Sequence, residues 1–210
     1  MRHMYKLYLF DQYEQLSEQF ISHALQFLPE NRRVRALRYR RKIDRWNCVI
    51  TYLLLQYGLR ECFGITSFEI VFGEYGKPYL LEYPHAHFNI SHCDSGCAVI
   101  VADCPVGVDI QDVRPFLWDV AKRVCCEREI AELGASEERD KLFIKMWTVK
   151  ECYGKVSGTG ILNMMKGFDT TKIGMDVFHL YSTQGHETSK LLCFILKPII
   201  GDSKILGLIL

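Results

Sequence analysis

The chain has 210 residues, which is enough for one large domain or two small ones, each with a buried core. With 49% hydrophobic and 24% charged residues, the composition is typical of a globular protein and excludes a disordered or fibrous chain. The formal net charge of +1 indicates no overall attraction to nucleic acid or to an anionic membrane, so any site for a polyanion must be local.

The cysteines and the chain ends indicate a cytoplasmic protein. The chain contains 9 cysteines, an odd number, with no C-x-x-C pair, and this favours reduced thiols over a disulfide framework. Charged residues interrupt the apolar residues near Met1, so no signal peptide is predicted. Residues 191–210 are apolar but contain Lys197, Pro198 and Asp202, which excludes a membrane span.

The first half of the chain predicts a strand, helices and then several strands. A strand at Tyr5–Phe10 precedes a helix at Gln12–Phe27 and a long helix at Asn31–Leu59, whose first part is rich in arginine and whose second part is apolar. From Phe68 the hydrophobic period changes to two. The strands expected there are Phe68–Phe72, Tyr79–Leu81, Phe88–His92, Gly96–Ala102 and Val106–Ile110.

The second half repeats the order of helices followed by strands. Helices are expected at Leu117–Cys126, Cys126–Gly134 and Glu137–Gly154, and strands follow from Gly167, including Leu191–Leu196 and Lys204–Ile209. The order predicts an α+β fold built from a pseudo-two-fold pair of similar α/β subdomains, residues 1–112 and 113–210. The two halves share no detectable sequence repeat, so the duplication is inferred from element order alone.

Two oxygen-bearing side chains share one face of the strand at residues 107–111. Residues two apart on a strand point the same way, so Asp109 and Gln111 project together while Val108 and Ile110 enter the core. A single aspartate of this kind is also typical of a turn at a strand end. By itself the segment does not decide between a cap and a metal ligand.

A second group of side chains lies on one face of the helix near residue 150. Trp147, Glu151 and Lys155 repeat at intervals of four, so a buried ring would place a carboxylate and an ammonium against a ligand. An ordinary surface Glu–Lys pair gives the same spacing. Gly158 and Gly160 then end the helix and favour a close approach of backbone to another group.

The middle of the chain carries groups suited to a pyrophosphate. Lys77 lies in a Gly-Lys-Pro turn as a fixed charge, and Ser91 beside His92 offers a hydroxyl and an imidazole. A tight turn and a helix N-cap remain the simpler alternatives for these residues.

Taken together, these segments resemble the Sfp-type 4'-phosphopantetheinyl transferases. That family shows G-K-P, then F-N-x-S-H, then G-[IV]-D-[IV]-E, then W-x-x-K-E-[AS]-x-x-K-x-x-G. The corresponding segments are Gly76–Pro78, Phe88–His92, Gly107–Gln111 and Trp147–Gly158. The resemblance covers residues 5 to about 165, and the last motif is the most specific.

The resemblance implies a fold, an activity and a set of site residues. Two α+β halves would hold coenzyme A between them as co-substrate, in a monomer that is internally a pseudo-dimer. The first half would contact the phosphate and adenosine end, and the second would supply the catalytic helix. Asp109, Glu151 and Gln111 would be the positions of the metal ligands. The phosphate contacts implied are Lys77, Ser91, His92, Lys155, Arg38 and Arg45.

The implied enzyme is a Mg²⁺-dependent holo-[acyl-carrier-protein] synthase, with Mn²⁺ as the alternative metal. The serine of an acyl or peptidyl carrier protein would attack the β-phosphorus of coenzyme A, and 3',5'-ADP would leave. Glu151 would take the serine proton, directly or through a metal-bound water, and Lys155 would stabilise phosphoryl charge. Apolar residues near Phe116–Val124 are expected to contact the carrier protein in fatty acid, polyketide or nonribosomal peptide biosynthesis.

Two departures from the family pattern affect the expected site. Gln111 stands where the family has a third acidic residue, and a neutral amide brings no charge, so weaker metal binding is expected. Asn47 stands where an arginine is common, shortly after Asp44-Arg45, so Arg45 or Arg38 is expected to hold that phosphate instead.

Three other functions remain alternatives. The basic segment Arg32–Arg45 could bind nucleic acid, although the rest of the chain has no excess of basic residues. A zinc or thiol site could use histidines and cysteines of the middle segment: His85, His87, His92, Cys93 and Cys97. A catalytically degenerate member of the family could bind coenzyme A without transferring from it. Cys152, next to Glu151, is expected to pack in the core.

Overall fold

The computed structural model describes residues 4–158, 166–172, 178–181 and 189–196. The described elements mix helices and antiparallel sheets, which confirms the predicted α+β class. The helices before the first large sheet are η1 (Tyr13–Gln15), α1 (Glu18–Ala24), η2 (Leu25–Phe27), α2 (Glu30–Arg38) and α3 (Lys42–Phe63). Those after it are α4 (Trp118–Val124), α5 (Glu127–Ala135), α6 (Arg139–Ser157) and η3 (Thr170–Lys172).

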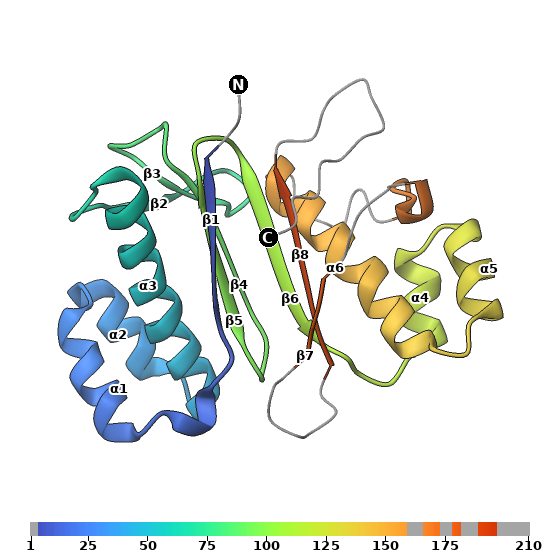
Figure 1. Ribbon diagram of the computed structural model, residues 1–210, viewed down its shortest axis with the longest axis horizontal. Helices are drawn as coiled ribbons and strands as arrows, with labels where there is room; N and C mark the ends of the chain where they lie inside the picture. The colour runs from blue at the N-terminus through green and yellow to red at the C-terminus, as the bar shows by residue number, and fades with distance from the viewer. Residues whose placement is uncertain (1–3, 159–165, 173–177, 182–188, 197–210) are drawn as a thin grey trace.

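The described strands form two three-stranded sheets and one hairpin. The sheet orders are β1-β5-β4, β2-β3 and β6-β8-β7, and every pairing is antiparallel. The strands are β1 (Tyr5–Phe10), β2 (Ile70–Phe72), β3 (Pro78–Leu80), β4 (His87–His92), β5 (Cys97–Ala102), β6 (Val106–Asp112), β7 (Phe178–Tyr181) and β8 (Ser189–Leu196). Helices α1, α2 and α3 lie on one side of these sheets and α4, α5 and α6 on the other, as Figure 1 shows.

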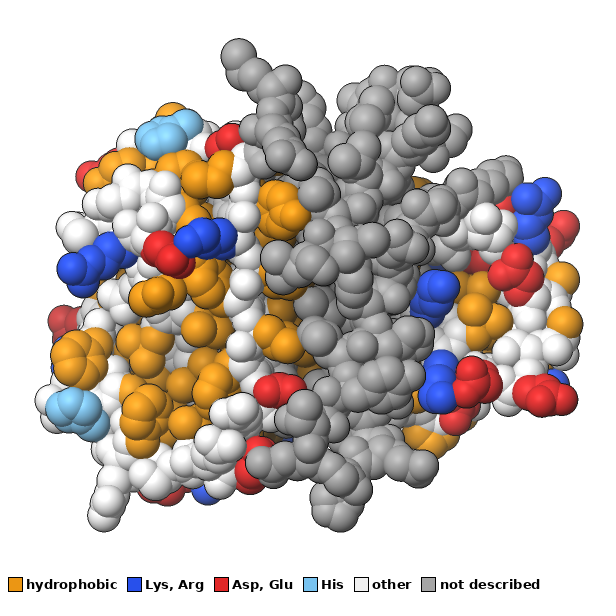
Figure 2. Space-filling model, viewed as in Figure 1, with side chains coloured by type: hydrophobic (Ala, Val, Ile, Leu, Met, Phe, Trp, Pro, Cys, Tyr) orange, Lys and Arg blue, Asp and Glu red, His pale blue; other side chains and the backbone are white. Residues whose placement is uncertain are grey.

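Strand β5 forms the centre of the first sheet. All its residues are apolar and buried, as expected for a strand covered on both faces. Strand β1 pairs with one of its edges and β4 with the other. Apolar side chains gather over α3 and β1 on the face shown in Figure 2. There the ring of Tyr8 on β1 meets that of Tyr57 on α3 edge-on, with centroids 5.7 Å apart.

The single long helix predicted at Asn31–Leu59 is wrong. The chain leaves the helix at Tyr39, which is extended (φ −69°, ψ 128°), and α3 starts at Lys42. Ala36 of α2 and Val49 of α3 lie in the same buried cluster, so the break allows α2 to pack against α3. The apolar area buried by this packing stabilises the broken arrangement.

The helix predicted at Gln12–Phe27 is interrupted as well. Ser17 is extended, and its side chain accepts a hydrogen bond from the backbone N–H of Phe20, which starts α1 as a regular N-cap. The residues on either side form the short turns η1 and η2.

Gly107 allows β6 to pack directly against α6. A Cβ atom at this position would collide with the carbonyl oxygen of Cys152 and with Val156, so no larger residue fits without moving the helix. Cys152 is fully buried, as predicted. This close approach brings the face of α6 that carries Glu151 next to Asp109 on β6.

The end of the chain bears on two further predictions. The expected strand at Leu191–Leu196 lies within β8, whereas the one expected at Lys204–Ile209 lies outside the described residues. Among the described helices, none combines the length and apolar character that crossing a membrane requires.

Candidate active site

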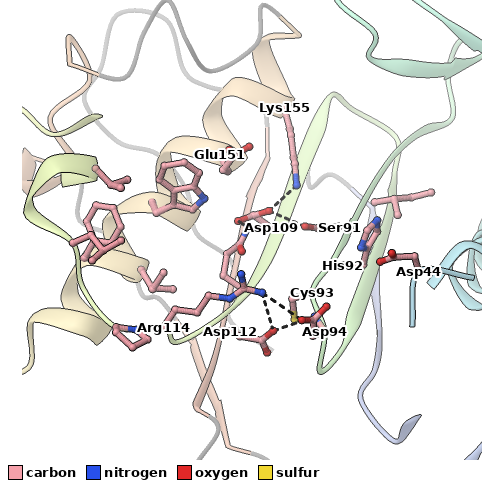
Figure 3. A pocket seen from close by; sticks show the side chains of 18 of the residues that line it. Asp44, Ser91, His92, Cys93, Asp94, Asp109, Asp112, Arg114, Glu151 and Lys155 are labelled. Carbon is pink, nitrogen blue, oxygen red and sulfur yellow. Dashed lines mark hydrogen bonds and ion pairs between the residues drawn. The ribbon is translucent and has the colours of Figure 1, made fainter. Parts of the chain in front are cut away.

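Of four cavities formed by the described residues, the largest lies where β4, β6 and α6 meet. It has a volume of about 750 Å³, and most of the predicted site residues line it (Figure 3). We call it the central cavity. The predicted residues along its wall are Ser91, His92, Asp109, Gln111, Glu151 and Lys155.

Asp109 lies at the bottom of this cavity and is only 1% exposed. Its Oδ1 accepts hydrogen bonds from the Ser91 hydroxyl and from the Lys155 ammonium, each at 2.7 Å. Its Oδ2 accepts one from the amide nitrogen of Gln111 at 3.1 Å. Val108 and Ile110 are fully buried, as the alternation predicted. The carboxylate is therefore held by three neighbours before any ligand binds.

Glu151 provides the second carboxylate of the cavity. Burial, and then the negative charge of Asp109, raise its pKa above the ordinary value, while the charge of Lys155 opposes the shift. Trp147 and Lys155 line the same cavity, so the predicted helix face is confirmed. Two carboxylates that repel each other in a shared cavity are the arrangement that a divalent cation relieves.

Lys155 connects the two walls of the cavity. In addition to Asp109, its ammonium donates to the carbonyl oxygen of Val108 at 2.9 Å. An ammonium has three N–H donors, so one remains for a further acceptor. A phosphoryl oxygen placed in the cavity can take this donor.

His92 lies between the central cavity and a smaller one. Burial, and then the charge of Lys155, lower the pKa of its imidazole, while Asp44 opposes the shift. The ring is therefore neutral near pH 7 in the free protein. The smaller cavity, of about 190 Å³, is lined by His92 together with Arg32 and Arg35. We call it the arginine cavity.

The arginines of the basic segment differ in whether they line a cavity. Arg38 and Arg45, the two chosen from the sequence, line none of the four described cavities, whereas Arg32 and Arg35 line two. The Arg32 guanidinium lies over the Tyr52 ring, 5.1 Å from its centroid, and its buried Nε has no hydrogen-bond partner among the residues that the structure describes. A basic run on a helix predicts a cationic face, but which of its arginines line a cavity depends on how the helix packs.

Lys77 lies in the turn between β2 and β3 and closes a third cavity of about 290 Å³, shared with Glu151 and Lys155. Its ammonium donates to the carbonyl oxygen of Val156, 2.7 Å away, near the end of α6. Burial lowers the pKa of Lys77. Gly158 ends α6 in a left-handed conformation (φ 72°), and a Cβ there would lie 3.2 Å from the Lys77 side chain.

The mouth of the central cavity carries two arginines that the sequence did not single out as site residues. Arg41, ahead of α3, and Arg114, after β6, both form ion pairs with Asp94 in the β4–β5 turn, at 2.8 and 3.6 Å. Leu117 is 61% exposed at the same mouth. In the sequence, the signal for this mouth was a large apolar residue, Leu117, close to the arginine Arg114.

The thiols proposed for a zinc or redox site are buried and uncharged. Burial raises the pKa of Cys93 to about 12 and that of Cys97 to about 11. Within the part of the chain that the structure describes, the compact group of potential metal ligands is a different one, Cys126, Glu129 and Asp169. The ammonium of Lys150 already lies 2.9 Å from Glu129 in that group.

Comparisons with known proteins agree with this geometry. A family model described as "4'-phosphopantetheinyl transferase superfamily" matches residues 105–199, and one described as "4'-phosphopantetheinyl transferase, N-terminal" matches residues 13–105. A 4'-phosphopantetheinyl transferase of Bacillus subtilis is 30% identical over 168 residues, covering 78% of this chain and 73% of the relative.

Two further relatives extend the comparison. The 4'-phosphopantetheinyl transferase Sfp of Bacillus subtilis (strain 168) is 31% identical over 152 residues, covering 70% of this chain and 67% of the relative. An L-aminoadipate-semialdehyde dehydrogenase-phosphopantetheinyl transferase of Candida glabrata is 25% identical over 153 residues, covering 68% and 59%. The chain belongs to the Sfp-type 4'-phosphopantetheinyl transferase family.

Proposed function

We propose that this chain transfers the 4'-phosphopantetheine group of coenzyme A to a serine of an acyl or peptidyl carrier protein. The observation that carries the proposal is the meeting of Asp109, Glu151 and Lys155 in one cavity. The names of the Bacillus relatives agree with it. The holo-carrier protein and 3',5'-ADP would be the products.

The donor set suits Mg²⁺. Asp109 and Glu151 offer carboxylate oxygens, and the Gln111 amide can present its oxygen, so the available atoms are those a hard cation prefers. Mn²⁺ is the alternative metal for the same oxygen ligands. When bound, the metal would neutralise charge on the pyrophosphate oxygens. The mutual repulsion of the two carboxylates supports this assignment.

The reaction assigns a separate task to each side chain. The serine oxygen of the carrier forms a bond to the β-phosphorus of coenzyme A, and the bond from that phosphorus to the bridging oxygen breaks. Glu151, whose raised pKa suits a general base, takes the serine proton. Lys155 uses its remaining N–H donor to stabilise negative charge on the transferred phosphoryl group.

The adenosine end of coenzyme A fits the basic residues that line the arginine cavity and the cavity closed by Lys77. Lys77 and His92 are candidate contacts to the phosphates of coenzyme A, as the family pattern implies. Arg32 and Arg35 are better placed than Arg38 and Arg45 for the 3'-phosphate, because they line the arginine cavity beside His92.

The carrier protein would dock at the mouth of the central cavity. Leu117 is exposed there, and Trp118, the next residue in the chain, is exposed as well. Both belong to the segment Phe116–Val124 expected to contact the carrier. Arg114 adds a positive charge beside them. Apolar residues next to a cation suit a partner with an apolar and acidic surface.

We further propose a pseudo-two-fold pair of subdomains in a cytoplasmic monomer. Each half has helices on the outside and a three-stranded sheet on the inside (Figure 1). The predicted boundary after residue 112 would separate β6 from β8, to which it is hydrogen-bonded. A junction near residue 105 suits this pairing better, and the two family models also meet there.

Nucleic-acid binding has less support. The arginines of the basic segment do not form one free surface, because Arg41 is paired with Asp94 and Arg32 lies over Tyr52. A gel shift at physiological salt should therefore show no stable complex.

The transfer itself is tested with the wild-type chain. The chain is incubated with coenzyme A and an apo carrier protein, and intact-mass spectrometry of the carrier follows the reaction. With Mg²⁺ the carrier should gain the mass of one phosphopantetheine arm, and excess EDTA should prevent the gain. A panel of acyl and peptidyl carrier proteins that all stay unmodified with Mg²⁺ would contradict the proposed activity and favour a degenerate, coenzyme A-binding chain.

A further inference from the structure

Along the edge of β6 that faces β4, backbone N–H groups donate to side chains of β4 rather than to its backbone. Strand β6 pairs along its other edge with β8, and β4 belongs to a different sheet. The backbone N–H of Val108 donates to the Asn89 side-chain oxygen at 2.9 Å. The N–H of Ile110 donates to the Ser91 hydroxyl at 3.3 Å. Because buried N–H groups are costly to leave unpaired, these two bonds join the sheets.

Asn89 and Ser91 are two residues apart, so both side chains leave β4 on the same side and meet alternate N–H groups of β6. Both are almost fully buried, at 4% and 6% exposure. Between their two contacts lies Asp109. The two-residue spacing of Asn89 and Ser91 therefore matches the two-residue spacing of the N–H groups along this edge of β6.

Ser91 makes one contact that Asn89 does not. Its hydroxyl donates to Oδ1 of Asp109 at 2.7 Å, as the dashed line in Figure 3 shows. A serine hydroxyl has a single hydrogen to donate, so in this arrangement none is left for a phosphate oxygen. Lys155 donates to the same Oδ1 from the opposite wall. Within the described residues, the Oδ2 atom accepts a hydrogen bond from Gln111 alone, so it is the freer oxygen for a cation.

We propose that Ser91 is a positioning residue that orients the Asp109 carboxylate for the metal, rather than a contact to the phosphates of coenzyme A. The inference rests on the proposed function, because it takes Asp109 as a metal ligand. Residues that orient a ligand through a hydrogen bond commonly change metal affinity by ~10–100-fold when they are removed. Asn89 differs from Ser91 in the contact to Asp109 and shares the contact to the β6 backbone.

The test compares Ser91→Ala with Asn89→Ala, using Mn²⁺ affinity measured by electron paramagnetic resonance in the absence of coenzyme A. Both variants lose one bond to β6, so both should lower the melting temperature. Ser91→Ala should weaken Mn²⁺ binding by ~10–100-fold, and Asn89→Ala should weaken it much less. Ser91→Thr, which keeps the hydroxyl, should restore the affinity. Should Ser91→Ala fail to fold, Ser91→Cys is a near-isosteric replacement with a weak donor, and it should also bind Mn²⁺ more weakly.

Three results would overturn the role of Ser91. The first is wild-type Mn²⁺ affinity in Ser91→Ala or Ser91→Cys. The second is an equal loss in Asn89→Ala, which would mean that strand alignment alone matters. The third is weaker coenzyme A binding by Ser91→Ala in EDTA with unchanged Mn²⁺ affinity, as a phosphate contact requires. A wild-type chain that binds no Mn²⁺ would instead contradict the proposed metal site, and with it the basis of this inference.

Discussion

His92 shows how one side chain can link coenzyme A binding to pH. Its imidazole faces Lys155 and Arg35, whose charges lower its pKa after the larger effect of burial, and Asp44 and Asp109, whose charges raise it. A phosphate bound beside the ring would favour the protonated form and raise the pKa in the complex. Binding should then take up protons at a pH between the two pKa values.

This coupling predicts that coenzyme A binds more tightly as the pH falls through that window. Calorimetric titrations in buffers of different ionisation enthalpy measure the proton uptake directly. The coenzyme A phosphates titrate too, so His92→Asn serves as the reference: its proton uptake should be smaller than that of the wild type. Equal uptake by both proteins would show that His92 does not contact the phosphate.

Single residues also show what the sequence could and could not predict about the site. The periods of a strand and of a helix predicted that Asp109 shares a face with Gln111 and that Glu151 shares one with Lys155. That these two faces form one site was implied by the family resemblance. The contact of Ser91 with Asp109 was not predictable, because it depends on how β4 and β6 lie against each other across two sheets. Asn47 is buried, and its amide donates to the carbonyl oxygen of Cys93 at 3.0 Å, a role that its departure from the family pattern did not suggest.

Among the elements, α5 and α6 are joined by a buried ion pair. The Lys150 ammonium lies 2.9 Å from the carboxylate of Glu129, and the two side chains are 1% and 0% exposed. Glu129 also accepts hydrogen bonds from the backbone N–H of Cys126 and from Thr170. Lys150 therefore holds α6 against α5.

Breaking this pair should destabilise the protein without removing a site residue. Lys150→Met leaves the Glu129 carboxylate buried without its cation, which should cost about 3–5 kcal/mol in the free energy of unfolding. Adding Glu129→Gln removes the unpaired charge and should recover part of the loss. Urea denaturation of the two variants and the wild type measures both effects. A Lys150→Met protein as stable as the wild type would contradict the role of the pair.

The helices were harder to predict than the strands. No glycine or proline marks the break at Tyr39–Arg41, and the helical propensity of the segment continues through it. The break follows from tertiary packing, since α2 buries Ala36 against the same cluster as α3. Arg38 and Arg45 were chosen from the family pattern, whereas Arg32 and Arg35 line the arginine cavity.

Over the whole molecule, the central cavity depends on contacts between the N-terminal and C-terminal elements. Ser91 and His92 come from β4 of the first sheet, Asp109 from β6 of the second, and Glu151 and Lys155 from α6. Gly107 permits the close packing of β6 on α6, and the Asn89 and Ser91 side chains join β6 to β4. The α+β class followed from the order of the elements, whereas this assembly required the structure.

The most direct test of the account is the rate at which Glu151→Gln modifies a carrier protein that the wild type modifies, measured by intact mass at saturating coenzyme A and Mg²⁺. The substitution keeps the size of the side chain and removes both the base and a charged ligand, so the carrier should remain unmodified. Transfer by Glu151→Gln at the wild-type rate would contradict the assignment of Asp109 and Glu151 as the catalytic centre.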